Sequence, residues 1–208
     1  MKIFGKGVPV GTTRCIISAS LLCATALGAA SAWTAPAAYA GSTLCLLPQI
    51  PDAAAPLVST AQVAKAFGST MSFQGEQVVP VTANNPEAQH TCSWQGPALF
   101  KSSSPYDINR VSVGVEVIGP FKTLASASAG YGNELKEWGP TAAVHGIGAR
   151  AVYVLAAQDT VTSQLIALWS RYIVWVTVGA PKSVTVKHQQ AGEAVIARAT
   201  VARIPSGG

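Results

Sequence analysis

Residues 164–179 read QLIALWSRYIVWVTVG, two apolar runs separated by Ser170 and Arg171. The runs Gln164–Trp169 and Tyr172–Gly179 are rich in the β-branched and aromatic residues that favour strands. A two-residue link joins only antiparallel neighbours, because a parallel crossover needs a dozen residues or more. The segment therefore predicts a β-hairpin, and the rest of the chain is interpreted by what can pair with it.

Further strands are predicted on the N-terminal side of this hairpin. In residues 111–117, valine alternates with serine, glycine and glutamate, which is the pattern of a half-buried strand. Pro80 interrupts the weakest candidate and indicates an edge strand or a loop there. The sequence predicts an antiparallel sheet of about five strands that ends in a C-terminal three-stranded meander. Outside the hairpin, the candidate strands are Val78–Val81, His90–Gln95, 111–117 and Ala149–Ala156.

Two or three helices are predicted to pack against this sheet. Ser59 and Thr60 can cap a short helix at Ala61–Phe67, which Gly68 would end. Apolar residues at spacings of three and four indicate an amphipathic helix over 124–138. A last helix is expected to begin at Val184 or His188 and to end at Arg203. This order of elements predicts an α+β fold with the helices on one face of the sheet.

The N-terminal residues have the pattern of a secretory signal peptide. A basic segment with Lys2, Lys6 and Arg14 precedes an apolar run. Ala38-Tyr39-Ala40 offers a cleavage site, and Ala30-Ser31-Ala32 is a second possible one. The alternative is a retained membrane anchor, for which the run is barely long enough. Cleavage would leave no stable membrane span and would place the protein outside the cytosol, secreted or in the periplasm or cell envelope. The predicted organisation is a signal peptide at 1–40, an irregular arm at 41–57, a single domain at 58–204 and a flexible tail at 205–208.

Removal of this leader would leave Cys45 and Cys92 as the remaining cysteines. In an oxidising compartment two such cysteines most simply pair with each other. The disulfide would close a loop of about 48 residues and stabilise the fold by ~4 kcal/mol on chain-entropy grounds. Free thiols, a redox pair and metal ligands are the alternatives, but the spacing is too wide for a Cys-x-x-Cys motif and no histidine stands at a recognised ligand spacing. Trp94 is expected on the same strand face as Cys92, where it can cover the disulfide.

Several short motifs occur in an order that resembles a known group of proteins. They are the early cysteine, the helix that ends in Gly68, Cys92-Ser93-Trp94, Val144-His145-Gly146-Ile147-Gly148-Ala149 and the closing alanine-rich helix. The arrangement resembles small exported proteins and lipoproteins of actinobacteria that form a domain-of-unknown-function family, some of them with a Mog1/PsbP-like α/β sandwich. The resemblance implies an exported α/β domain, and no established activity comes with it. Neither Cys23 nor Cys45 has the preceding small residue of a lipidation site.

Composition and motifs exclude several classes of function. Basic residues exceed acidic ones by only 14 to 9, and three of the basic ones lie in the leader, so no nucleic-acid-binding patch is predicted. No cofactor is predicted, and no zinc or calcium signature occurs. Serine-hydrolase and phosphate-binding motifs are also absent from the sequence. His90 is expected at a surface or edge, and His188 is expected to be solvated at a helix start.

Two functional hypotheses remain. The first is a non-catalytic exported binding module for a small apolar ligand or an envelope protein, with Trp138, Trp169, Tyr172 and Trp175 as candidate ligand-binding residues. Their alternative role is to fill the core between sheet and helices. The second is a hydrolase-type enzyme whose site is built from loops around His145, with a carboxylate such as Asp159 or Glu116 as its partner. His145 can equally be a turn residue between glycines.

Overall fold

The structure is a computed structural model, and it describes residues 45, 56–82, 87–97, 110–138, 141–154, 162–181 and 184–206. Every described residue belongs to one compact unit, Ala40–Gly208. The predicted signal peptide and nearly all of the predicted arm lie outside the described residues.

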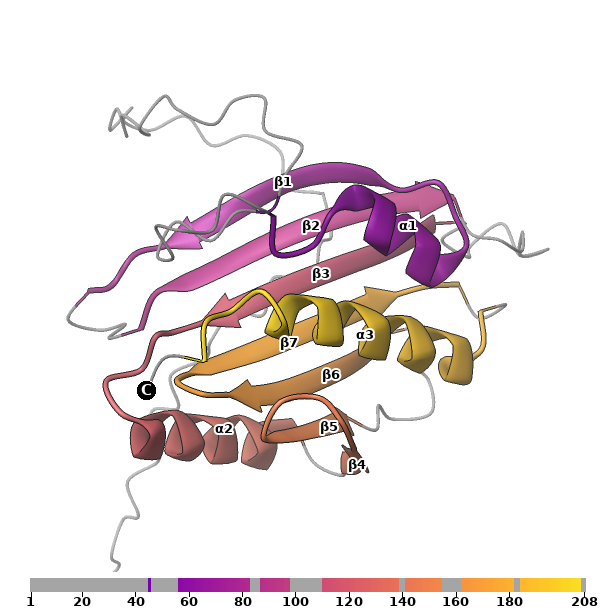
Figure 1. The fold of residues 1–208 in the computed structure, drawn as a ribbon. Helices are drawn as coiled ribbons and strands as arrows, with labels where there is room; N and C mark the ends of the chain where they lie inside the picture. Colours follow the sequence, from indigo (N-terminus) through magenta and orange to yellow (C-terminus); the bar gives the residue numbers. More distant parts are fainter. Residues whose placement is uncertain are drawn as a thin grey trace, which may run out of the picture. The chain divides into compact units, whose positions relative to one another are not determined.

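The described residues form one antiparallel sheet of seven strands in the order β1-β2-β3-β7-β6-β5-β4 (Figure 1). The predicted hairpin is its centre, where β6 pairs with β7 and Trp169 stands opposite Tyr172. β3 pairs with the other side of β7. The strands are β1 (Ser72–Val79), β2 (Gln89–Pro97), β3 (Arg110–Ile118), β4 (Thr141–Val144), β5 (Arg150–Val154), β6 (Thr162–Trp169) and β7 (Tyr172–Gly179).

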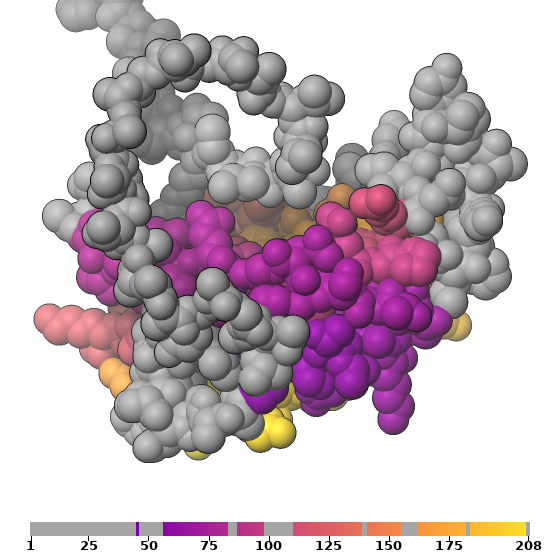
Figure 2. Space-filling model, turned by 90° about the horizontal axis from the view of Figure 1, so that it is seen from above, coloured from indigo at the N-terminus to yellow at the C-terminus, as the bar shows by residue number. Residues whose placement is uncertain are grey.

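The predicted number of about five strands is therefore wrong, although the α+β class and the antiparallel pairing are confirmed. β1 lies before Pro80 instead of across it, and its register with β2 shifts between Phe73 and Gly75. β4 has only four residues and extends the predicted three-stranded meander by a fourth strand. From above, most of the coloured surface belongs to α1 and β1, which is an edge strand of the sheet (Figure 2).

The three predicted helices are present within a few residues of their expected bounds: α1 (Thr60–Phe67), α2 (Leu124–Trp138) and α3 (Val186–Val201). Ser59 and Gln62 form a capping box at the start of α1, and Gly68 ends it in the left-handed conformation with φ 61°. Thr185 caps α3 by accepting a hydrogen bond from the backbone N–H of His188.

The expectation that all helices cover one face of the sheet is wrong. α1 and α3 pack against one face, with Leu165, Ala167, Val174 and Val176 in that cluster. α2 packs against the opposite face, where Ile166, Leu168, Ile173 and Trp175 form a second cluster. Successive strand residues point to opposite faces, so β6 and β7 are apolar on both sides because both sides are covered.

The packing of α3 against α1 depends on Gly192, which lies against the ring of Phe67. A Cβ at this position would overlap the Phe67 ring, and Phe67 is itself buried. We expect Gly192→Ala to destabilise the protein by about 1–3 kcal/mol, because overpacking outweighs the gain in helix propensity. Urea unfolding followed by tryptophan fluorescence measures the change.

Gly132→Ala on α2 is the matched control, since a Cβ there would meet nothing within 4 Å. It is expected to stabilise the protein by about 1 kcal/mol, the ordinary advantage of alanine over glycine in a helix. Equal stabilisation by both substitutions would contradict the close α1–α3 contact.

Candidate functional site

Trp138 and Trp175 meet on the α2 side of the sheet. Trp138 is the last residue of α2, and Trp175 lies in the middle of β7. Their ring centroids are 5.7 Å apart with an interplanar angle of 66°, an edge-to-face contact. Trp175 is only 7% exposed, whereas Trp138 is half-buried.

Trp169 and Tyr172 belong to the other face. They stand opposite each other at the β6–β7 turn and join the cluster beneath α3. The indole N–H of Trp169 donates to the carbonyl oxygen of Ile204 at 3.0 Å. Burial raises the pKa of Tyr172, and the nearby charge of Arg171 opposes that shift. The four aromatic candidates therefore form two pairs on opposite faces, and they do not line one common site.

The tryptophans on the two faces of the sheet also differ in their hydrogen bonds. Trp94 and Trp169, on the α3 side, donate to Thr60 Oγ1 and to the Ile204 carbonyl oxygen. The Nε1 atoms of Trp138 and Trp175 are buried without a hydrogen-bond partner, and so is Oε1 of Gln164. Buried polar groups in proteins are rarely left unpaired, so each exception needs a cause. We call Trp138, Trp175 and Gln164 the indole site.

The register of the strands places Gln164 beside Trp175. Trp175 stands between Glu116 on β3 and Ile166 on β6, and in the next row Thr177 stands between Gly114 and Gln164. Residues two apart on a strand share a face, so Gln164 and Trp175 are diagonal neighbours on the α2 side. Gly114 carries no side chain, and a Cβ there would have only the Cβ of Thr177 within 4 Å. Next to the indoles, the sheet therefore presents polar side chains and a position without a side chain.

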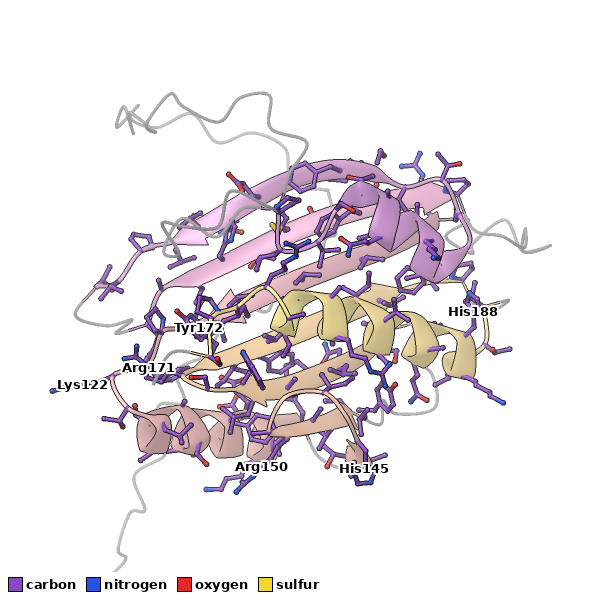
Figure 3. The ribbon with its side chains drawn as sticks, in the orientation of Figure 1. Lys122, His145, Arg150, Arg171, Tyr172 and His188 are labelled. Carbon is purple, nitrogen blue, oxygen red and sulfur yellow. A yellow bond between two sulfur atoms is a disulfide. The ribbon has the colours of Figure 1, made fainter. Side chains whose placement is uncertain are left out.

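His145 lies in the turn between β4 and β5 and is exposed (Figure 3). Gly146 and Gly148 flank Ile147 with φ of 73° and 59°, which only glycine adopts readily. Within the described part of the chain, no hydrogen bond or ion pair joins His145 to a carboxylate, and Asp159 lies outside it. Glu116 is on β3, separated from β5 by two strands, and has interactions of its own. His188 is exposed at the start of α3, as predicted (Figure 3).

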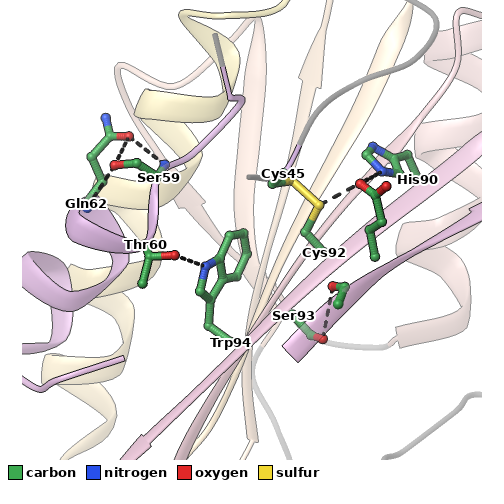
Figure 4. Close-up of a disulfide and its surroundings, with 10 residues drawn as sticks. Cys45, Ser59, Thr60, Gln62, His90, Cys92, Ser93 and Trp94 are labelled. Carbon is green, nitrogen blue, oxygen red and sulfur yellow. Dashed lines mark hydrogen bonds and ion pairs between the residues drawn. A yellow bond between two sulfur atoms is a disulfide. The ribbon is translucent and has the colours of Figure 1, made fainter. Parts of the chain in front are cut away.

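The predicted disulfide between Cys45 and Cys92 is confirmed (Figure 4). Its Cα atoms are 5.8 Å apart, and both cysteines are at most 1% exposed. Trp94 lies on the same face of β2, as expected, and contacts Phe73 edge-to-face with ring centroids 5.4 Å apart. The crosslink thus joins the segment before α1 to the second strand of the sheet.

His90 is not at the surface, contrary to expectation, because it is only 1% exposed. Its Nε2 lies 3.2 Å from Glu76 Oε2 and 4.0 Å from Cys92 Sγ. Burial lowers the pKa of His90, while the hydrogen bond and charge of Glu76 act in the opposite direction. The alternation of side chains along β2 could have predicted that His90 is buried, since residue 90 shares a face with residues 92 and 94.

A buried carboxyl group, Glu193, was not singled out in the sequence. Glu193 is fully buried on α3, and Ser163 Oγ on β6 donates a hydrogen bond to its Oε2 at 3.1 Å. Desolvation raises the pKa of Glu193 to about 8, and the Ser163 hydrogen bond only partly offsets it. The available signal was helical spacing, because Glu193 follows the buried Gln189 by four residues and precedes the buried Ala197 by four.

No family model matches this chain, and no curated protein matches it. Among solved structures, the extracellular domain of PknH from Mycobacterium tuberculosis is similar, with a TM-score of 0.38 and 11% sequence identity. The similarity covers 68% of this chain and 91% of that domain. A similarity of this size establishes neither a shared function nor a shared ligand. The resemblance to exported actinobacterial proteins stays a prediction.

None of the helices within the described ranges combines the length and the apolar character that a membrane crossing requires.

Proposed function

We propose that this chain is an exported binding module that holds a small ligand at the indole site. Export is supported by the Cys45–Cys92 disulfide, because such bonds persist mainly in oxidising compartments. It is also supported by the signal-peptide pattern of residues 1–40. The proposed location is the extracellular space or the cell envelope.

The observation that carries the binding role is the pair of unpartnered indole N–H groups of Trp138 and Trp175. A buried donor without an acceptor costs about 1–3 kcal/mol, and the other two described tryptophans do have acceptors. A ligand with oxygen acceptors would satisfy both N–H groups. The unpartnered Oε1 of Gln164, on the same face, calls for a donor such as a hydroxyl or an amide.

The surroundings of the indoles suggest the rest of the ligand. The Trp138–Trp175 contact is part of the apolar cluster beneath α2, which also contains Ile166 and Ile173. Next to it the strands present Thr177, Gln164 and the bare backbone of Gly114. Sites with an apolar wall and a few placed polar groups suit a small molecule with an apolar body and a polar end. The proposed ligand is therefore a small amphiphile with oxygen acceptors.

The test uses 1-anilinonaphthalene-8-sulfonate, a probe with apolar rings and sulfonate oxygens. We expect the double variant Trp138→Phe, Trp175→Phe to bind the probe about tenfold or more weakly than the wild type. The rings remain aromatic while two hydrogen bonds of about 1 kcal/mol each are lost. Fluorescence titration measures the affinity, and circular dichroism establishes that the variant is folded.

Trp169→Phe is the matched control, because its indole N–H donates to Ile204 on the opposite face. It is expected to leave the affinity for the probe unchanged. Equal weakening by both variants, or none by the double variant, would contradict binding at the indole site. Native mass spectrometry of secreted protein would show whether a ligand is retained.

A further inference from the structure

A second cluster of chemically active side chains lies near the edge of the sheet, on β1, on β2 and at Cys45. Cys45, His90 and Cys92 each have a ligand atom within 4.8 Å of those of the other two, and all three residues are buried. Glu76 Oε2 lies 3.2 Å from Nε2 of His90, and the side chain of Glu76 is 23% exposed. The cluster thus has a buried centre made by Cys45, His90 and Cys92 (Figure 4), and one carboxylate on a partly exposed side chain.

We propose that Cys45, Cys92 and His90 form a binding site for a thiophilic divalent cation such as Zn²⁺ when the disulfide is reduced. Glu76 is placed to take the fourth position. Two thiolates and one imidazole, completed by a carboxylate or water, are the ligands that zinc accepts in tetrahedral sites. Nothing in the indole site or in its proposed ligand bears on this second site.

The positions of the donor atoms fit such a site. Zn–S bonds of about 2.3 Å and Zn–N bonds of about 2.0–2.1 Å place tetrahedral ligand atoms about 3.3–3.8 Å apart. Nε2 of His90 is 4.0 Å from Cys92 Sγ and 3.2 Å from Glu76 Oε2. The sulfur atoms would have to separate to about 3.8 Å after reduction. The Cα atoms of Cys45 and Cys92 are 5.8 Å apart, so the two segments that carry these cysteines are already adjacent.

The charges favour a cation once the disulfide is open. Reduction leaves two thiols next to the Glu76 carboxylate, and burial disfavours thiolates without a positive partner. A dication offsets the charge of the thiolates and of Glu76 together. A cation bound to Nε2 of His90 would replace the hydrogen bond between Nε2 and Glu76 Oε2, so the carboxylate would be free to act as a ligand.

The chemical steps balance with an external reductant. A dithiol gives two electrons and two protons to the Cys45–Cys92 bond and closes to its own disulfide. Binding of the cation then displaces the two thiol protons. The covalent crosslink between the early segment and β2 is replaced by a coordinated one at the same place. The site would therefore keep these segments together whenever the disulfide is not formed.

The experiment uses the full chain with Cys15→Ser and Cys23→Ser, so that Cys45 and Cys92 carry the remaining thiols. The protein is reduced with a phosphine, which is removed under argon, and Co²⁺ is titrated as a spectroscopic probe. We expect one Co²⁺ per chain, a thiolate-to-metal charge-transfer band, the visible bands of tetrahedral Co²⁺ and displacement by Zn²⁺. The oxidised protein is expected to show none of these signals.

His90→Gln tests the third ligand. We expect the affinity of the reduced protein for Co²⁺ to fall by at least about tenfold and the visible bands to change. The control is His188→Gln, at an exposed position on α3, which should change neither. If reduction unfolds the chain, Co²⁺ is expected to restore the native circular dichroism spectrum. Absence of a charge-transfer band in the reduced protein, failure of Co²⁺ to restore the fold, or identical binding by His90→Gln would overturn the proposal.

Discussion

Replacing both Cys45 and Cys92 with alanine is expected to lower the free energy of unfolding by about 4 kcal/mol. The crosslink joins residues that are 47 positions apart, and its loss restores the conformational freedom of the loop between them in the unfolded chain. Alanine avoids placing a hydroxyl group in the apolar cluster, where both cysteines are almost fully buried. Guanidinium unfolding followed by tryptophan fluorescence measures the difference.

The reduced wild type in the presence of a chelator is the comparison for this variant. It should lose a similar amount of stability, because the same constraint is removed while both sulfur atoms remain. A loss below about 1 kcal/mol in both would show that the disulfide does not restrict the unfolded state as chain-entropy arguments require. In protein that lacks Cys15 and Cys23, two reactive thiols after denaturation without reduction would show that the bond is not formed in solution.

Substitution of Glu193 by glutamine is expected to stabilise the protein by about 3 kcal/mol at pH 7. The pKa of Glu193 is raised to about 8 in the folded protein from an ordinary 4.5, so folding at pH 7 requires a proton that the unfolded chain has released. Each pH unit between the two values costs about 1.4 kcal/mol. Glutamine needs no proton, and it keeps an oxygen that can accept the hydrogen bond from Ser163.

The sign of the pH dependence distinguishes the protonation of Glu193 from other causes of a stability change. A carboxyl group with a raised pKa contributes its full stability below pH 4.5 and loses it as the pH rises to about 8. The stability of Glu193→Gln relative to wild type should therefore be near zero at pH 4 and grow up to pH 8. His90, whose pKa is lowered, acts in the opposite sense, because its contribution is lost as the pH falls through 6.5 and below.

Urea unfolding of both proteins at several pH values gives this comparison, because shared contributions such as that of His90 cancel. Glu137→Gln serves as the control, since Glu137 is exposed on α2. It should change stability little at any pH. A stability difference for Glu193→Gln that does not vary with pH would mean that the folded protein does not hold Glu193 protonated.

The sequence predicted those elements whose local pattern is unambiguous. The β6–β7 hairpin, the valine alternation of β3 and the capped α1 helix were expected because turn length, period and caps each act locally. β1 was mostly missed because an exposed edge strand has no buried face to show in its sequence, and Gly75 shifts its register. β4 was missed because four residues are too few to show a period.

The placement of α2 required a different signal. The apolar spacing of α2 identifies its buried side but not the face of the sheet on which that side rests. The information lay in β6 and β7, whose runs LIALW and YIVWV are apolar at successive positions. Such strands are typical of sheets covered on both faces, and this pattern predicts helices on both sides.

The candidate sites were predictable only in part. Cys45 and Cys92 could be paired because export would leave no other cysteine. Trp138 and Trp175 were named together with Trp169 and Tyr172, but their separation into two faces depends on where α2 packs. Glu193 was missed because a glutamate in a helix is usually solvated. Its spacing of four from Ala197 indicated the buried side of α3, and the contact of Glu193 with Ser163 on β6 shows that it is buried.

The coverage of β6 and β7 on both faces has a consequence for how the domain opens. Every side chain from Leu165 to Leu168 and from Ile173 to Val176 is buried, alternately in one cluster and in the other. A fluctuation that releases either strand must disrupt both layers at once, so these strands can separate only when the whole domain unfolds. β1 has no fully buried side chain, and thermal motion can detach it alone. The sheet is thus expected to open from the β1 edge inward, and the central β6–β7 hairpin is expected to separate last.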